Sequence, residues 1–315
     1  MLKGGKDFNS KDLIKSEVIN DIKKRSGSSY PLLVNNLNKL KGDSYKKLFD
    51  SALSLLNNTY GLGSSVWVGF NENWAIELFP TLAMMYPKAK FLIIYRDPRA
   101  SIASALKQKD VKKKIQVYSF ACGWRKNIAF MLQYQSNKLF KDRLIICKYE
   151  NFVKRPDQEL KKILYHLNIE YLPEMLDPQC FKDGEGKTWK GNSYIHKIKP
   201  KGIYKDSINA WKNNLEPRIV KSIEFITWAE LKLLGYETYY SDKLFLDKEA
   251  LNFFYEDANV ESSWKSSKLS LDQRIGMELF RSQILKSCIT NLSINKIKKY
   301  FLFTEAFHYL HNISK

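Results

Sequence analysis

Residues 91–104 read FLIIYRDPRASIAS, and this stretch decides the fold. The apolar run at 91–95 is typical of a short strand that is buried on both faces. Asp97 is a favourable N-cap and Pro98 is a favourable first helical residue, so the sequence predicts a strand, a turn and a helix start within a few positions. Arg96 is therefore expected at the carboxyl end of the strand.

Two other apolar runs, VWVGF and LIIC, have the same character. They alternate with amphipathic helical patterns, which is the sequence signature of an α/β fold whose parallel sheet is flanked by helices. We expect three parallel strands, at Val66–Phe70, Phe91–Tyr95 and Leu144–Cys147. Ligands of such sheets bind at the carboxyl ends of the strands, where Arg96 and Lys148 are expected.

Composition narrows the function only slightly. Lys and Arg number 52 against 33 Asp and Glu, a net charge of +19, which favours an anionic partner such as a nucleotide, an acidic glycan, a nucleic acid or an anionic membrane surface. A simple lysine-rich bias explains the charge equally well. The four cysteines show no metal-ligand spacing, so we expect no metal site and a reducing compartment. We find no signal peptide or membrane span pattern and expect a cytoplasmic protein.

The segment after the second apolar run has the chemistry of a phosphate site. An arginine fork, a nearby hydroxyl and a helix N-terminus together bind phosphate, because the guanidinium forms charge-assisted bonds and the helix dipole adds positive potential. Arg96, Ser101 and Ser104 supply the first two of these elements. The alternative is a surface arginine beside two solvated serines.

The spacing of Arg96 and Ser104 resembles the 3'-phosphate motif of PAPS-dependent sulfotransferases, in which a serine follows the arginine by eight residues. Tyr149, in the segment KYENF, is similar to the family tyrosine near the adenine, although it is also compatible with a core aromatic. The segment TWKGNS at 188–193 resembles the loop that closes over the nucleotide in bacterial members; alone, it would be an ordinary polar turn. This resemblance implies nucleotide contacts from Arg96, Ser104, Tyr149, Lys190, Gly191, Asn192 and Ser193.

The resemblance also implies a fold and a reaction. The fold is a P-loop-NTPase-like sheet at 66–236, preceded by a helical segment at 1–65 and followed by a helical extension at 237–315. The reaction is transfer of a sulfuryl group from PAPS (3'-phosphoadenosine 5'-phosphosulfate), as co-substrate, to a hydroxyl or amine of a glycan or small-molecule acceptor. The rival interpretation is a non-catalytic anion- or nucleic-acid-binding module on a degenerate scaffold, although no nucleic-acid motif is found.

One departure from the family pattern and one candidate residue concern catalysis. The family holds the 5'-phosphosulfate in a loop after an N-terminal strand, and the only match is KRSGSS at 24–29, which follows a charged helical pattern at 17–23 instead of a buried strand. We therefore expect an N-terminally truncated or reduced member, with a chance match at 24–29 as the alternative to a genuine loop. The candidate general base is Glu72, which is also compatible with a solvated glutamate at a helix start.

Overall fold

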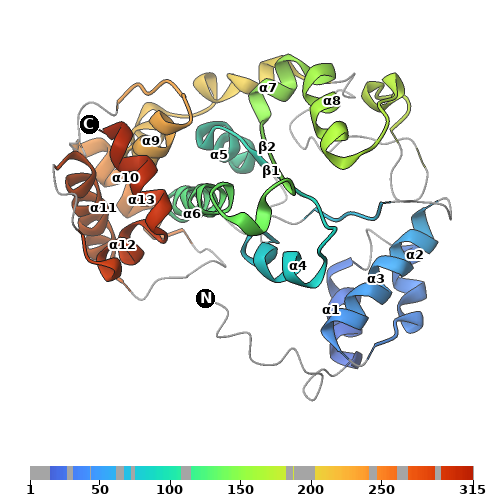
Figure 1. Ribbon diagram of the computed structural model, residues 1–315. Helices are drawn as coiled ribbons and strands as arrows, with labels where there is room; N and C mark the ends of the chain where they lie inside the picture. Colours follow the sequence, from blue (N-terminus) through green and yellow to red (C-terminus); the bar gives the residue numbers. More distant parts are fainter. Residues whose placement is uncertain are drawn as a thin grey trace. The chain divides into compact units, whose positions relative to one another are not determined.

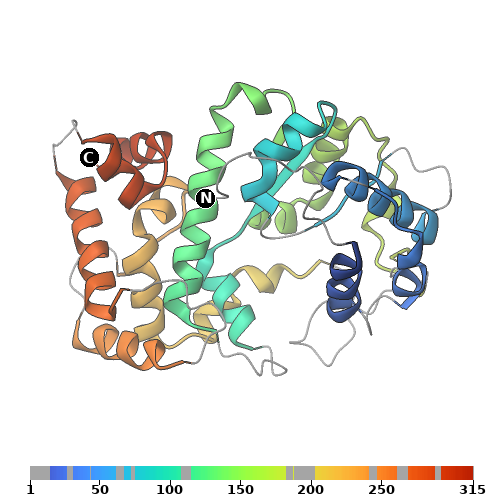
Figure 2. The same ribbon diagram turned by 90° about the horizontal axis from the view of Figure 1, so that it is seen from below.

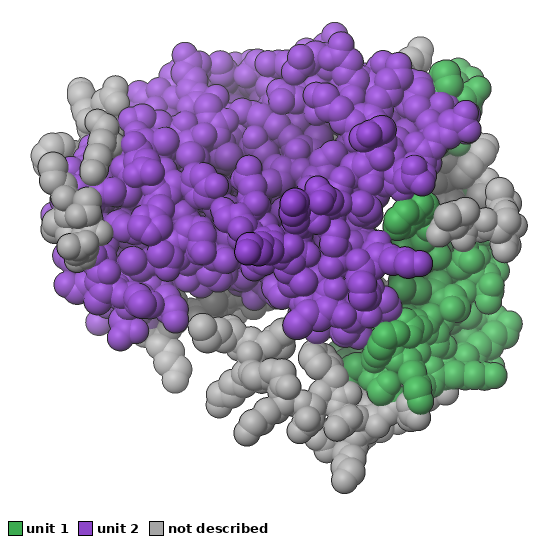
Figure 3. Space-filling model, in the orientation of Figure 1, with its two compact units in different colours: residues 1–75, 173–190 green, residues 76–172, 191–315 purple. Residues whose placement is uncertain are grey.

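The computed structural model describes eleven stretches of the chain. They are residues 15–26, 31–42, 44–61, 67–71, 75–107, 115–181, 187, 203–240, 247–260, 269–287 and 292–314. The chain divides into two compact units, one formed by residues 1–75 with 173–190 and the other by residues 76–172 with 191–315 (Figure 3). The three-part division expected from the sequence stays a prediction.

The first unit is helical in the part that the structure describes. It contains α1 (Lys15–Ser26), α2 (Pro31–Asn36), a 3-10 turn (Leu37–Lys39), α3 (Tyr45–Tyr60) and a further 3-10 turn (Pro173–Leu176). Its core is a cluster of buried leucines, Leu37, Leu40, Leu48 and Leu55. Helix α1 covers residues 17–23, as their charged helical pattern predicts, while residues 27–29 of the KRSGSS match lie outside the described residues.

The second unit contains the parallel strands. Strand β1 (Phe91–Tyr95) pairs with β2 (Leu144–Lys148), and Tyr95 lies opposite Lys148 at their carboxyl ends. The chain connects them through α5 (Pro98–Leu106), α6 (Val117–Gln135) and a 3-10 turn (Lys138–Phe140). The prediction of two parallel strands followed by Arg96 and by the turn into α5 is therefore confirmed (Figure 1).

Helices cover the two sides of this strand pair. Phe91 and Ile93 of β1 pack with Trp124 and Ile128 of α6, next to the short helices at Ala75–Leu78 and at Phe79–Met85 (α4). On the other side β2 continues into α7 (Tyr149–Lys154) and α8 (Pro156–Leu167). Figures 1 and 2 show α6 and α8 on opposite sides of the strands.

A cluster of helices follows toward the C-terminus. After two 3-10 turns (Lys205–Ile208 and Ala210–Asn213) come α9 (Pro217–Leu233), α10 (Lys248–Ala258), α11 (Leu271–Lys286), α12 (Ile294–Phe301) and α13 (Thr304–Ser314). Helix α9 is buried along most of its length because α6, α10 and α13 all pack on it. Gly235, with a φ of 67°, allows the left-handed turn that ends this part of the chain, as expected for a helix C-terminus. No helix in the described residues has the length and apolar character to cross a bilayer.

The strand prediction for residues 66–70 is wrong where the structure describes them. Residues 67–70 have no strand geometry, and Trp67, Val68 and Phe70 are exposed. A short apolar run has no periodicity to distinguish a strand from other structure, and a central glycine such as Gly69 weakens strand formation. Phe70 instead packs edge-on against Phe49 of α3, with ring centroids 5.5 Å apart. The described sheet therefore has two strands, and the P-loop-like detail of the fold prediction is not observed.

Candidate functional site

The turn after β1 is fixed by hydrogen bonds within the chain. The Asp97 carboxylate accepts the backbone N–H of Arg99 at 2.8 Å, as an N-cap does, and Pro98 begins α5. Glu150, just beyond the end of β2, accepts the backbone N–H of Asp97 at 2.9 Å. Because each contact involves a residue at a strand end, the parallel pairing of β1 and β2 sets the position of Arg96.

Arg96 itself lies beside a tyrosine and a serine from distant parts of the chain. Its guanidinium stacks over the ring of Tyr149, 4.4 Å from the ring centroid, and its Nη2 donates to the carbonyl of Ser207 at 2.6 Å. The hydroxyls of Tyr149 and Ser207 are 3.1 Å apart, and Trp124 donates its indole N–H to the Arg96 carbonyl at 2.8 Å. The structure thus brings together Arg96 and Tyr149, two of the residues predicted to bind the nucleotide.

One nitrogen of Arg96 has no partner in the described part of the protein. Its Nε is shielded from solvent and makes no hydrogen bond there. A buried donor without an acceptor costs free energy, so a native protein generally provides one. The guanidinium is therefore held in place by Ser207 and Tyr149, and its Nε is an unsatisfied donor among the described residues.

Of the other predicted site residues, the structure describes Ser104 but not Glu72 or residues 190–193. Ser104 is half-buried in the second half of α5, and the contacts of Arg96 described above do not include it. The nearer hydroxyl, Ser101, is engaged with the Asp97 carbonyl at 3.1 Å. Glu72 and the residues Lys190, Gly191, Asn192 and Ser193 lie outside the described residues, so their roles stay predictions.

A sequence profile described as the Sulfotransferase family matches residues 41–173. This match spans the turn after β1 and the Tyr149 segment. Residues 41–173 are thus similar to the sulfotransferase family.

Two curated proteins and one solved structure are similar to parts of this chain. The chain is 27% identical over 172 residues to a protein-tyrosine sulfotransferase of Drosophila melanogaster, a match that covers 53% of this chain and 32% of that protein. It is 24% identical over 167 residues to a putative protein-tyrosine sulfotransferase of Caenorhabditis briggsae, covering 50% and 56% respectively. The chain thus spans about a third to just over half the length of these relatives.

The solved structure is a sulfotransferase domain from the curacin biosynthetic pathway. Its TM-score is 0.47 at 18% identity, covering 71% of this chain and 78% of that one.

Sequence reasoning missed Ser207, which lies beside Arg96 in the candidate site. Nothing in the composition of the surrounding segment distinguishes Ser207 from its polar neighbours, such as Asp206 and Asn209. Ser207 lies 111 residues from Arg96, and only the fold brings the two together. A serine that donates its hydroxyl to the carbonyl three residues earlier, here Tyr204, gives a weak turn signal and no functional one.

Lys148 lies at the same sheet edge but is structurally engaged. Its Nζ donates to the Leu234 carbonyl at 2.8 Å and lies 3.8 Å from the ring centroid of Tyr236. Burial lowers the pKa of Lys148. The Tyr236 hydroxyl in turn donates to Glu150 at 2.9 Å. These contacts tie the segment after α9 to the end of β2, so Lys148 has a structural role at this edge of the sheet.

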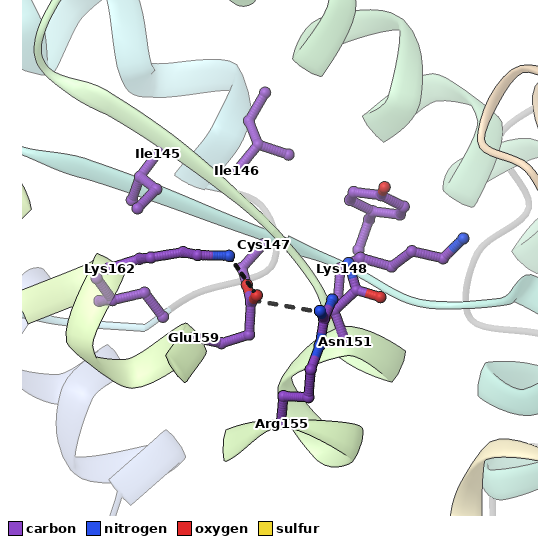
Figure 4. Close-up of a pocket in the computed structure, with 10 residues that line it drawn as sticks. Ile145, Ile146, Cys147, Lys148, Asn151, Arg155, Glu159 and Lys162 are labelled. Atoms are coloured by element: carbon purple, nitrogen blue, oxygen red, sulfur yellow. Dashed lines mark hydrogen bonds and ion pairs between the residues drawn. The ribbon is translucent and has the colours of Figure 1, made fainter. Parts of the chain in front are cut away.

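A cavity of about 330 Å³ lies beside β2 (Figure 4). Residues with alternating orientations on β2, such as Ile145 and Ile146, both line it, so the cavity runs along the strand edge that faces away from β1. Lys162 reaches toward Glu159, with a 2.7 Å ion pair, and the Arg155 side chain points toward the same carboxylate from the other side (Figure 4). The lining does not include Arg96, which separates this cavity from the site described above.

Proposed function

We propose that this protein is a PAPS-dependent sulfotransferase in which Arg96 binds the 3'-phosphate of the nucleotide. The observation that carries the proposal is the shielded Nε of Arg96, which has no partner among the described residues although the guanidinium is fixed over Tyr149. A phosphate oxygen would accept from this nitrogen in a charge-assisted bond. The similarity of residues 41–173 to the sulfotransferase family supports the same assignment.

The neighbouring elements favour an anion at this position. Arg96 precedes the N-terminus of α5 by two residues, and the helix dipole places partial positive charge there. Tyr149 offers an aromatic face and a hydroxyl next to the guanidinium, consistent with the expected position near the adenine. Ser104, Lys190, Gly191, Asn192 and Ser193 remain the proposed further donors to the nucleotide.

The proposed reaction is a direct in-line transfer. An acceptor oxygen forms a bond to the sulfur of PAPS while the bond from sulfur to the bridging phosphate oxygen breaks, and adenosine 3',5'-bisphosphate leaves with that oxygen. The proton of the acceptor hydroxyl passes to a general base, for which Glu72 is the candidate. Cationic side chains that fix the nucleotide contribute by positioning the donor and by stabilising the negative charge of the leaving group.

The acceptor is proposed to be a hydroxyl on a molecule that carries negative charge. The net charge of +19 favours such a molecule by long-range attraction. The curated relatives are named protein-tyrosine sulfotransferases, which makes a tyrosine hydroxyl in an acidic peptide the first acceptor to test. An acidic glycan and a small hydroxylated metabolite follow, as the sequence analysis predicts.

The decisive test compares adenosine 3',5'-bisphosphate with AMP, which lacks only the 3'-phosphate. If Arg96 binds that group, calorimetric titration of the full chain shows about ten- to a hundredfold tighter binding of the bisphosphate. Equal affinities would remove the proposed site.

Transfer from labelled PAPS to the acidic tyrosine peptide is then measured with the same protein. We expect the protein to bind adenosine 3',5'-bisphosphate well but to transfer the sulfuryl group of PAPS slowly. The reason is that the segment at 24–29 lacks the preceding strand of a phosphosulfate loop. Tight nucleotide binding with no transfer to any of the three acceptor classes would favour the non-catalytic binding module.

A further inference from the structure

The segment at 204–213 contacts both arginines at the start of α5. It contains the two 3-10 turns that precede α9, of which the first packs on α7 and the second on α5 (Figure 1). The first turn carries Ser207, whose carbonyl accepts from Nη2 of Arg96 at 2.6 Å. The second carries Trp211, whose ring centroid lies 4.1 Å from the guanidinium of Arg99. One short segment therefore connects the two arginines.

Trp211 anchors this segment in the protein interior. Its side chain is 5% exposed and belongs to the core cluster that also contains residues of α5, α6 and α9. The arginine under its ring, Arg99, is buried and forms ion pairs with Asp97 and Glu224. Because these ion pairs hold Arg99, Trp211 packs on a fixed surface. The backbone four residues earlier, at Ser207, is thereby set in place.

The Ser207 hydroxyl orders the turn that presents this carbonyl. It donates to the Tyr204 carbonyl at 2.6 Å and lies 3.1 Å from the Tyr149 hydroxyl. Since the single hydroxyl proton of Ser207 goes to Tyr204, the Tyr149 hydroxyl is the donor of the second bond. The ring of Tyr149 in turn stacks on the Arg96 guanidinium at 4.4 Å. Ser207 thus holds Arg96 directly, through its carbonyl, and indirectly, through Tyr149.

These contacts set the direction of the remaining donors of Arg96. A guanidinium carries its N–H groups in a rigid planar fork, so a bond at Nη2 and a ring against one face fix the orientation of Nε. Without such contacts a long arginine side chain samples several rotamers, and a ligand must overcome the lost entropy. A phosphate that accepts from Nε therefore depends on Ser207, although Nε itself has no partner among the described residues.

We propose that Ser207 is a positioning residue that favours nucleotides with a 3'-phosphate by holding Arg96 in the orientation that binds this group. The inference rests on the proposed function, because it takes the phosphate contact of Arg96 from there. Ser207 itself makes no contact with the nucleotide. It acts through Arg96 and Tyr149, and Trp211 keeps it in place.

The first test measures nucleotide selectivity in Ser207→Ala, with the full chain. Calorimetry gives the affinities of adenosine 3',5'-bisphosphate and of AMP, whose ratio reports the 3'-phosphate alone. Loss of the hydroxyl should weaken binding of the bisphosphate about three- to tenfold and leave binding of AMP unchanged. Ser207→Thr keeps a hydroxyl and should retain the wild-type ratio. Equal weakening of both nucleotides in S207A, as a purely structural role would cause, overturns the proposal.

Ser287→Ala is the matched control. Ser287 is half-buried like Ser207, and its hydroxyl also donates to the carbonyl three residues earlier, that of Ile284, at 2.8 Å. It lies at the C-terminal end of α11 and makes none of the contacts of Arg96 described above. Thermal melts show that both variants are folded. S287A should keep the wild-type ratio, and an equal loss of selectivity in S287A and S207A overturns the proposal.

The double variant with Arg96→Ala shows whether Ser207 acts through that residue. In the R96A background, S207A should weaken binding of the bisphosphate no further, because the group that it positions is gone. A further loss of about three- to tenfold would place the Ser207 hydroxyl in contact with the nucleotide and overturn the positioning role.

The wild type separates this inference from the proposed function. If it binds AMP and the bisphosphate equally, the proposed function fails and the role of Ser207 fails with it. If it prefers the bisphosphate and S207A keeps the full preference, only the positioning role is overturned.

Discussion

Arg96 and Arg99 lie three residues apart around the start of α5, yet their surroundings differ. Arg99 is 2% exposed and donates to both oxygens of Asp97 and, at 2.6 Å, to Glu224. Its guanidinium also lies 4.1 Å from the ring centroid of Trp211. Arg96 has a carbonyl and a ring as neighbours, and its Nε has no partner among the described residues.

This difference separates a structural arginine, Arg99, from Arg96, which we propose binds the nucleotide. Although burial disfavours the cation, Asp97 and Glu224 raise the pKa of Arg99. Glu224, itself fully buried, also accepts the backbone N–H groups of Tyr239 and Tyr240. Arg99 therefore connects β1, α9 and the segment after it, and has little capacity left for a ligand. By contrast, the Nε of Arg96 has no acceptor among the described residues, as expected of an arginine that binds an anion.

The largest expected effect is on stability, in the variant Arg99→Ala. Removing the guanidinium leaves two buried carboxylates, Asp97 and Glu224, without their cation. Breaking a buried pair in this way costs about 3–5 kcal/mol of the free energy of unfolding. Urea denaturation measures it, with Arg218→Ala as control, because Arg218 is half-buried and pairs at the surface with Glu216 and Glu256. A loss below about 1 kcal/mol in R99A would contradict a structural role.

The reactivity of Cys147 gives a second way to distinguish the structural role of Arg99 from the role of Arg96. Cys147 is 3% exposed in β2, and burial raises the pKa of its thiol to about 11. Alkylation at pH 8 therefore requires opening of the fold, since both access and the thiolate are missing in the folded state. Arg99→Ala should accelerate the modification of Cys147 a hundredfold or more, and Arg96→Ala should not. Peptide mapping resolves Cys147 from the exposed Cys180, which reacts at a similar rate in all variants.

The same thiol gives a pH dependence with a defined sign. The pKa of an unfolded cysteine is about 8.5, and the folded value for Cys147 is higher. Its contribution to stability is complete below about pH 8.5 and is lost as the pH rises toward 11. Denaturation between pH 8 and 10.5 should show this loss in the wild type, and Cys147→Ser, which does not titrate there, should show less of it. Identical pH profiles would contradict the raised pKa.

Arg96→Ala has the next largest effect, and it acts on binding. Loss of the charge-assisted contact from Arg96 weakens binding of adenosine 3',5'-bisphosphate about ten- to a hundredfold. Stability should fall by about 1–2 kcal/mol, less than in R99A, because the Ser207 hydrogen bond and the Tyr149 contact are lost while Asp97 and Pro98 still fix the turn. Titration measures the affinity and a thermal melt measures the stability, with Arg218→Ala as the charge-matched control. A large drop in melting temperature at unchanged affinity would show that Arg96 is structural.

The sequence predicted the strand, the cap and the helix at 91–106 because each signal there is local. Asp97 and Pro98 act on their immediate neighbours, and the buried run at 91–95 is flanked by them. The run at 66–70 has similar apolar composition but no such turn, and residues 67–70 form no strand. Partners distant in sequence, such as Ser207 and Glu224, depend on how the chain folds back, which no local pattern encodes.

The smallest expected effect is that of Tyr149→Phe. The change removes the hydroxyl that lies 3.1 Å from the Ser207 hydroxyl and keeps the ring under the Arg96 guanidinium. Nucleotide affinity should fall about two- to fivefold, as expected for one neutral hydrogen bond that orders the Ser207 segment. Tyr149→Leu also removes the cation–π contact and should cost about tenfold or more.

Tyr165→Phe is the matched control for this last change, because Tyr165 is 88% exposed on α8. Titration of adenosine 3',5'-bisphosphate into all three variants orders their affinities. If Tyr149→Leu binds the nucleotide as the wild type does, Tyr149 is a packing residue and the partner of Arg96 must be sought elsewhere. If Tyr149→Phe loses as much affinity as Arg96→Ala, the Tyr149 hydroxyl contacts the nucleotide directly. Tyr149 then joins Arg96 as a ligand-binding residue, in contrast to the structural Arg99.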